Sequence, residues 1–113
     1  MEEILSKKRF VHEKIPVKIY NDSEDASKAV AYEIALLIQR KKTEGLSCVL
    51  GLATGNTPKS VYNELIRLHR EEGLSFQHVV SFNLDEYYPM QPDSLQSYVR
   101  FMYEQLFNHV DIS

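Results

Sequence analysis

The chain has 113 residues, of which 43% are hydrophobic and 26% are charged, and its formal net charge is −3 at pH 7. This length and composition indicate one globular unit and exclude a disordered chain. The acidic balance gives no basic surface for nucleic acid, so we expect no nucleic-acid partner. No secretory leader or membrane-length apolar stretch is present, so we expect no membrane partner and a cytoplasmic location.

The N-terminal third is predicted to hold an arm, a strand and a helix. Residues 1–15 are charged and show no period, which indicates an N-terminal arm. Residues 16–20 alternate between apolar and polar side chains, which predicts a short strand. Apolar residues then recur at helical spacing, which predicts an amphipathic helix with Ser23 as its N-cap and its end near Lys42.

The remaining elements alternate strand with helix. Residues 47–52 form a continuous apolar run, which predicts a strand buried on both faces. Helical spacing returns over 58–70, a further strand is predicted over 79–83, and a last amphipathic helix is predicted over 93–107. That last helix begins with Asp93, which forms a capping-box pattern with Gln96.

This alternation predicts parallel βαβ units and therefore an α/β fold, a Rossmann-like parallel three-layer sandwich. Three strands make a narrow sheet, and parallel sheets need cover on both faces, so we expect the sheet to be incomplete within this chain. An open sheet edge favours pairing with another copy. A homo-oligomer is therefore among the expected partners. The single cysteine, Cys48, lies in the second predicted strand and is expected to be buried, and no metal site is predicted.

Two strand-to-helix turns occupy the position where ligands bind in such sheets. In the first, Gly55 permits a positive φ and Asn56 tolerates one, Thr57 is the predicted N-cap, and Pro58 suits the first helical position. The N–H groups of residues 54–59 would then form a phosphate cradle at the positive end of the helix dipole. The alternative is an ordinary turn without a ligand, because neither a dinucleotide motif nor a P-loop is present.

The second turn carries two adjacent acids, Asp85 and Glu86, at the end of the third predicted strand. Neighbouring side chains leaving a strand point to opposite sides, so one acid can face the pocket while the other supports the scaffold. An aspartate is ionised at neutral pH and can accept a proton from carbon or oxygen. The alternative is a solvated acidic turn with no chemical role.

Taken together, these turns resemble the glucosamine-6-phosphate deaminase family. The sequences Leu-Ala-Thr-Gly-Asn-Thr-Pro and Phe-Asn-Leu-Asp-Glu-Tyr lie within four similar segments that occur in the family's order, namely 50–58, 73–87, 96–102 and 107–112. Four ordered segments are more specific than one. The resemblance implies that residues 16–113 are the N-terminal part of a sugar-phosphate isomerase/deaminase domain.

The resemblance further implies a cofactor-free conversion of glucosamine 6-phosphate to fructose 6-phosphate and ammonia, so a small phosphosugar is the expected partner. Asp85 would remove the C2 proton of the opened sugar and return it at C1. Glu86 beside it is a predicted substrate-binding residue. The phosphate would be bound by the residues of the first turn, Thr54, Gly55, Asn56 and Thr57.

The sequence departs from the family in two ways. Many members have glycine at Asn56, and the family's ring-opening Asp-Gly-His segment with its following Glu is absent, as are the basic residues that complete its phosphate site. We therefore predict that this chain alone has no deaminase activity. Two alternatives stay open, a non-catalytic sugar-phosphate sensor and a 6-phosphogluconolactonase-like hydrolase. The Phe-Asn-Leu-Asp-Glu-Tyr motif argues against the hydrolase and equally against a ribose-5-phosphate isomerase.

Overall fold

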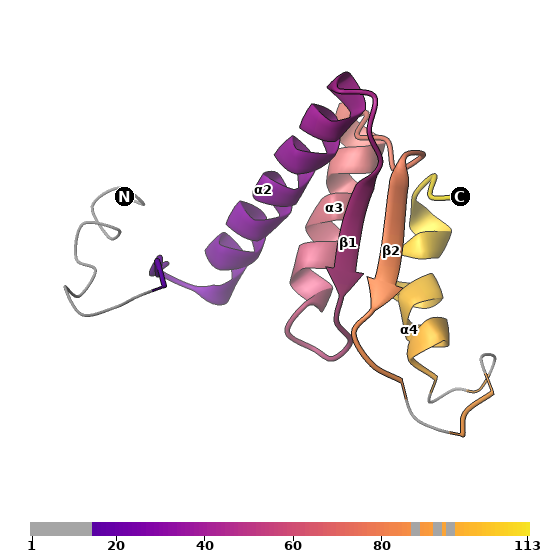
Figure 1. The fold of residues 1–113 in the computed structure, drawn as a ribbon. Helices are drawn as coiled ribbons and strands as arrows, with labels where there is room; N and C mark the ends of the chain where they lie inside the picture. The colour runs from indigo at the N-terminus through magenta and orange to yellow at the C-terminus, as the bar shows by residue number, and fades with distance from the viewer. Residues whose placement is uncertain (1–14, 87–88, 92–93, 95–96) are drawn as a thin grey trace.

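A computed structural model describes residues 15–86, 89–91, 94 and 97–113 (Figure 1). Its elements, in chain order, are α2 (Ser23–Thr43), β1 (Cys48–Leu52), α3 (Lys59–Glu72), β2 (Val79–Asn83), α4 (Tyr98–Gln105) and the 3₁₀ helix η1 (Phe107–His109). The predicted α/β class is confirmed by this order and by its structural relatives described below. The predicted arm at residues 1–15 lies almost wholly outside the described residues.

The sheet of the described chain has two parallel strands. β1 pairs with β2 in a register that runs from Cys48 opposite Val79 to Leu52 opposite Asn83, and α3 forms the crossover between them. The strand predicted over 16–20 is wrong, because this segment runs without strand pairing. Its apolar side chains, Ile15 before it and Val17 and Ile19 within it, are exposed by 75%, 45% and 55%.

One face of the sheet is covered by helices. Buried side chains of α2, α3 and α4 join those of both strands in a single core, in which Leu65 of α3 and Met102 of α4 are fully buried. Cys48 of β1 lies in this core as a free cysteine, as predicted, and burial raises the pKa of its thiol. The thiol is therefore protonated and unreactive at neutral pH.

The opposite face of the sheet is bare. Val49, Val80 and Phe82 point away from the core and are exposed by 59%, 44% and 63%. The prediction that β1 is buried on both faces is therefore wrong, because the described helices cover the other face only. Since both faces of parallel sheets are normally covered, the predicted incompleteness of the sheet is confirmed.

The helix ends show which capping residues prevailed. The N-cap of α2 is Asp22 and not the predicted Ser23, since the Asp22 carboxylate accepts a hydrogen bond of 2.8 Å from the Asp25 N–H. The C-cap of α3 is Gly73, which has a φ of 74°. A left-handed glycine at this position is a common end of a helix.

The last helix begins later than predicted. α4 starts at Tyr98 and not at residue 93, and its N-cap is Ser97, whose hydroxyl accepts a hydrogen bond from the Arg100 N–H. A serine whose hydroxyl accepts a hydrogen bond from the backbone N–H three residues later is a favoured N-cap. The predicted capping pair, Asp93 and Gln96, lies outside the described residues.

An Asp111 clamp joins the C-terminal segment to the amino end of β2. The Asp111 carboxylate accepts hydrogen bonds from the Ser75 hydroxyl at 2.8 Å and from the Phe76 N–H at 2.6 Å, and it lies 3.6 Å from His69 Nδ1. Burial alone raises the pKa of Asp111, but these hydrogen bonds outweigh it and hold the pKa below its ordinary value. His69 Nδ1 also lies 2.6 Å from the Leu74 carbonyl, which gives this histidine a structural role.

Candidate functional site

The turn between β1 and α3 lies at the carboxyl end of the sheet, where both strand arrows point (Figure 1). Gly55 has a φ of 108°, so the predicted need for glycine is confirmed, whereas Asn56 does not adopt a positive φ. The N-cap of α3 is Pro58, one residue later than predicted, and no side chain caps this helix. Lys59 N–H donates to the Asn56 carbonyl at 3.3 Å, and Tyr62 N–H donates to the Pro58 carbonyl at 3.0 Å, so the helix begins after Pro58.

Because of the hydrogen bond from Lys59 to Asn56, the predicted phosphate cradle has one backbone donor fewer than expected. Lys59 N–H is occupied by the Asn56 carbonyl and does not face a ligand. By contrast, four consecutive backbone N–H groups have no acceptor within the part of the chain that the structure describes, those of Thr54, Gly55, Asn56 and Thr57. Such a run of unpaired donors before a helix is suited to binding an anion.

Tyr62 anchors this turn from within α3. Its side chain is only 3% exposed, and its hydroxyl donates a hydrogen bond to the Ala53 carbonyl, directly before Thr54. Burial raises the pKa of Tyr62, so the hydroxyl stays protonated at neutral pH. Tyr62 was not among the predicted site residues, although a buried tyrosine on an apolar helix face usually finds a partner for its hydroxyl.

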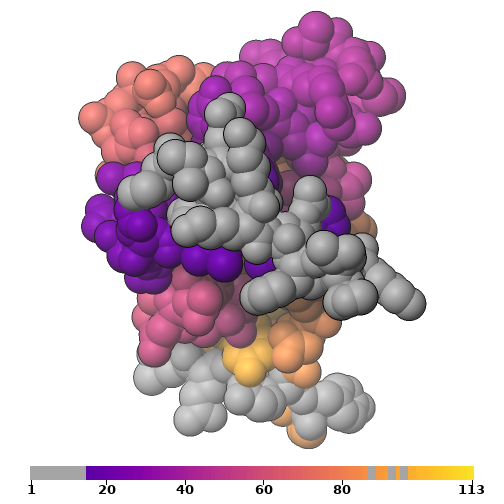
Figure 2. Space-filling model, turned by 90° about the vertical axis from the view of Figure 1, so that its left-hand side faces the viewer, coloured from indigo at the N-terminus to yellow at the C-terminus, as the bar shows by residue number. Residues whose placement is uncertain are grey.

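A cavity of about 740 Å³ opens between this turn and the start of α2. Seen from the α2 side, residues at the start of α2 lie close above those at the start of α3 (Figure 2). No charged side chain is among the described residues of its wall, which are Ser23, Ala26, Ser27, Val30, Ala53, Thr54, Asn56, Thr57, Pro58, Ser60 and Val61. The contribution of α2 to this wall was not predicted, because it depends on the packing of α2 against α3.

Asp85 lies at the same end of the sheet as the turn. Leu84 N–H donates to the Leu52 carbonyl at 3.0 Å, which continues the strand pairing one step beyond β2. Thr54 and Asp85 each follow a paired residue, Leu52 and Asn83, by two positions. Asp85 is exposed, does not line the cavity, and makes no hydrogen bond within the described residues.

Glu86 contacts α4. Its carboxylate accepts hydrogen bonds from the Ser97 hydroxyl at 3.3 Å, from the Tyr98 N–H at 3.1 Å and from the Val99 N–H at 3.2 Å. Of the two acids, Glu86 therefore has the contacts expected of the scaffold residue. Its predicted role in substrate binding, like the roles of Asp85 and the turn residues, stays a prediction.

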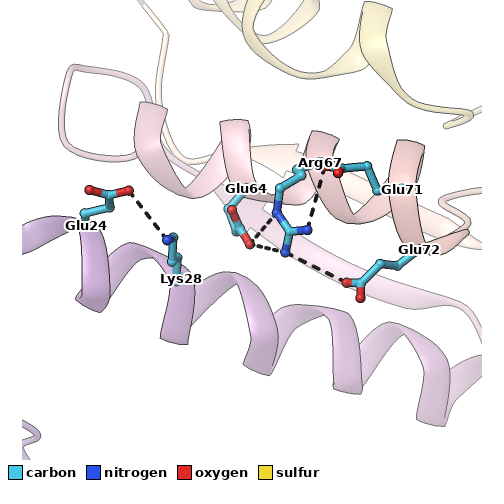
Figure 3. Close-up of polar contacts among 6 residues, drawn as sticks. All are labelled: Glu24, Lys28, Glu64, Arg67, Glu71 and Glu72. Atoms are coloured by element: carbon cyan, nitrogen blue, oxygen red, sulfur yellow. Dashed lines mark hydrogen bonds and ion pairs between the residues drawn. The ribbon is translucent and has the colours of Figure 1, made fainter.

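Three cations of α2 and α3 make contacts outside the turn, namely Lys28, Lys59 and Arg67. The Lys59 ammonium lies 5.8 Å from the centre of the Phe101 ring of α4. Arg67 of α3 pairs with three acids of its own helix, while Lys28 pairs with Glu24 on α2 (Figure 3). The acids around Arg67, at 2.6, 3.7 and 3.8 Å, are Glu64, Glu71 and Glu72. Among the described residues, the groups offered to a phosphate in the cradle are therefore backbone donors and the helix dipole.

The described residues contain neither a cluster of metal-binding side chains nor a membrane-spanning helix. No group of three or more histidine, cysteine, aspartate or glutamate side chains in this part of the chain is arranged to hold a metal ion. No helix there is both long and apolar enough to cross a membrane.

Comparison with known sequences identifies relatives that are much longer than the region they share with this chain. No protein-family model matches the chain. A putative glucosamine-6-phosphate deaminase-like protein of Bacteroides thetaiotaomicron is 49% identical over 100 residues, which are 88% of this chain and 15% of that protein. Glucosamine-6-phosphate deaminase 2 of Giardia intestinalis is 54% identical over 90 residues, which are 80% of this chain and 33% of that protein.

Comparison with solved structures gives the same picture. A monomeric glucosamine-6-phosphate deaminase superposes with a TM-score of 0.77 at 40% identity, covering 83% of this chain and 37% of that one. A 6-phosphogluconolactonase of Thermotoga maritima superposes with a TM-score of 0.66 at 28% identity, covering 83% of this chain and 40% of that one. Both similarity measures are higher for the deaminase, in agreement with the resemblance predicted from the sequence.

Proposed function

We propose that this chain, which belongs to the glucosamine-6-phosphate deaminase family, supplies the phosphate-binding turn and the proton-transfer base for converting glucosamine 6-phosphate to fructose 6-phosphate and ammonia. The identity of about half of its aligned residues to deaminases over 80% or more of its length carries the proposal. The proposed enzyme comprises more than this chain, because the chain spans 15% to 33% of these relatives.

The proposed chemistry divides between the two strand-end turns. The N–H groups of Thr54 to Thr57 bind the phosphate, which holds the sugar by the end that does not react. Asp85, on the neighbouring strand end, takes the proton from C2 of the opened sugar and returns it at C1, which leaves an imine at C2. Water then adds to this imine and ammonia leaves, so that C2 becomes the carbonyl carbon of the ketose. Clamping the phosphate is what brings the reacting carbon to the base, and such positioning lowers the barrier.

Two measurements test this function. Phosphate binding is tested by titrating the labelled chain with fructose 6-phosphate and following the amide resonances of residues 54–57, which should shift. The base is tested in a protein that contains this chain together with the length its relatives have. Such a protein should introduce solvent deuterium at C2 of glucosamine 6-phosphate, and Asp85→Asn should abolish this exchange. Deuterium exchange that survives Asp85→Asn would contradict the role of Asp85.

A lactonase is the second candidate, because a 6-phosphogluconolactonase shares the fold and 28% of the aligned residues. Hydrolysis of 6-phosphogluconolactone without release of ammonia from glucosamine 6-phosphate would favour it. A protein of full family length that binds fructose 6-phosphate but exchanges no deuterium would instead be a sensor. For this chain alone we expect no release of ammonia, as predicted from the missing segments.

The remaining assignments are proposals of the same kind. We assign residues 16–113 to the N-terminal part of the domain and residues 1–15 to an arm, and we place the enzyme in the cytoplasm without a cofactor. A homo-oligomer is proposed for this chain from its bare sheet face, although the solved deaminase it superposes on is described as monomeric.

A further inference from the structure

Glu86 joins the residue proposed as the base to a helix that is fixed in the core. α4 has only eight residues, Tyr98–Gln105, and helices this short are marginal without caps and packing. Its packing comes from Met102, which is fully buried, and from Leu106 just after it, which is 1% exposed. The start of α4 is therefore a rigid point to which a neighbouring loop can be tied.

The Glu86 carboxylate is tied to that point by several hydrogen bonds. Tyr98 N–H lies 3.1 Å from both carboxylate oxygens, and Val99 N–H lies 3.2 Å from one of them. The hydroxyl of Ser97, which is only 1% exposed, donates a further bond of 3.3 Å. A carboxylate at a helix N-terminus is also favoured by the helix dipole. A side chain held in this way has no freedom to follow a substrate.

Asp85 is consequently held on both sides. On one side Leu84 N–H donates to the Leu52 carbonyl at 3.0 Å, which fixes the backbone to the sheet. On the other side Glu86 fixes the next residue to α4, and adjacent Cα atoms are only about 3.8 Å apart. The backbone of Asp85 is thereby suspended between the sheet and α4, even though its own carboxylate makes no hydrogen bond within the described residues.

From this geometry we infer that Glu86 is a positioning residue, which restrains Asp85 by binding the start of α4, and not a ligand of the substrate. The inference rests on the proposed function, since it gives Glu86 its purpose through Asp85. It replaces the expectation that Glu86 binds substrate directly. It also explains why two adjacent acids are useful at this strand end, because only one of them needs to be available to a ligand.

The test uses the isotopically labelled chain and needs no ligand. Amide hydrogen exchange at Tyr98 and Val99 reports the cap, and the backbone order parameter of Asp85 from NMR relaxation reports its restraint. In Glu86→Ala, exchange at both amides should become about tenfold faster, as expected for lost hydrogen bonds to a charged group. The backbone order parameter of Asp85 should fall towards that of a flexible loop. Glu86→Gln, which keeps an acceptor oxygen, should restore part of both effects.

Ser97→Ala is the matched control, because it weakens the cap of α4 and removes one hydrogen bond to Glu86 but leaves the Glu86 carboxylate on the backbone N–H groups. In this variant the backbone order parameter of Asp85 should stay close to the wild-type value. The inference is overturned if the Asp85 backbone is flexible in the wild-type chain, if Glu86→Ala leaves its order parameter unchanged, or if Ser97→Ala lowers it equally. A wild-type chain that fails to bind fructose 6-phosphate counts against the proposed function only, since these readouts do not depend on binding.

Discussion

The two ends of the sheet differ in how their polar groups are satisfied. At the amino end, the Asp111 clamp holds the Ser75 hydroxyl and the Phe76 N–H, and Cys48 N–H donates to the His78 carbonyl. At the carboxyl end, four N–H groups of the turn after β1 and the carboxylate of Asp85 have no partner within the described residues. These groups are half-buried or exposed, so water can satisfy them, and the N–H groups are available to an anionic ligand at this end of the sheet.

The comparison separates stability from function along the strands. Polar groups at the amino end are engaged with each other and contribute to folding, whereas those at the carboxyl end are held in place by anchors that lie just outside them. These anchors are the Tyr62 hydroxyl on Ala53, Leu84 on Leu52, and Glu86 on α4. Substitutions at the two ends should therefore have opposite effects on stability and on binding.

The largest loss of stability should follow from Asp111→Ala. This variant leaves the Ser75 hydroxyl and the Phe76 N–H without their shared acceptor, and we expect the free energy of unfolding to fall by about 2–3 kcal/mol. Urea unfolding measures the change. The matched control is Glu33→Gln, which removes an exposed pair with Lys18 and should cost less than about 0.5 kcal/mol. Equal losses in the two variants would contradict the conclusion that the polar groups at the amino end of the sheet stabilise the fold.

The pH dependence of stability should follow the same carboxylate. The pKa of Asp111 is lowered in the folded chain, so its contribution is fully present above its ordinary pKa of about 3.9 and is lost as the pH falls through the folded value. The pKa of Glu64 is also lowered, chiefly by its hydrogen bond from Arg67, and acts in the same direction. Unfolding free energies between pH 5 and pH 2 should therefore fall less steeply in Asp111→Asn than in the wild type. An equal pH dependence of the unfolding free energy in the two proteins would contradict the stabilising role of the Asp111 carboxylate.

At the other end, Gly55→Ala should affect both stability and binding. A Cβ at this position meets no atom within 4 Å, but the φ of 108° is one that alanine rarely adopts. We expect a cost of about 1–2 kcal/mol and weaker binding of fructose 6-phosphate, because the donors of the turn would be displaced. Gly45, with a φ of 74° and equal space, is the matched control near the amino end. Gly45→Ala should lower stability without weakening binding.

Much of the fold could be predicted from sequence periodicity, and the errors have physical causes. Helix periods and the strands at Cys48 and Val79 depend on local patterns, which the sequence contains. The prediction of a strand at 16–20 was wrong because a strand needs a second strand to pair with, and the alternating pattern does not show whether one is present. The exposure of Val49 likewise reflects which helices are available to cover a face. A run of apolar residues predicts only that cover is needed.

The candidate site divides in the same way. Gly55 and Asp85 could be named as candidates because glycine in a turn and an acid at a strand end carry information by their residue type. Tyr62 was not named because its contact with the turn depends on where α3 places the hydroxyl. Alternation alone left two roles for Glu86, and its contacts with α4 support the scaffold role.

The bare sheet face gives a smaller effect on stability and a clear effect on assembly. Phe82 is 63% exposed, so Phe82→Gln should change the free energy of unfolding by less than about 0.5 kcal/mol. If copies of this chain associate through the bare face, light scattering should show wild-type oligomers that the variant converts to monomers. Leu36→Gln on α2, where the side chain is 48% exposed, is the control and should leave the oligomers intact. A monodisperse wild-type monomer would contradict the proposed self-association.

The smallest effect on stability should come from Asp85→Asn. Its carboxylate is exposed and makes no hydrogen bond within the described residues, so the free energy of unfolding should stay within about 0.5 kcal/mol of wild type. Binding of fructose 6-phosphate should not weaken and should tighten slightly, because a negative charge near the phosphate is removed. Thermal unfolding and titration of the same sample measure both quantities. A destabilisation above about 1 kcal/mol would mean that Asp85 has a structural partner, and stability and function would then no longer lie at separate ends of the sheet.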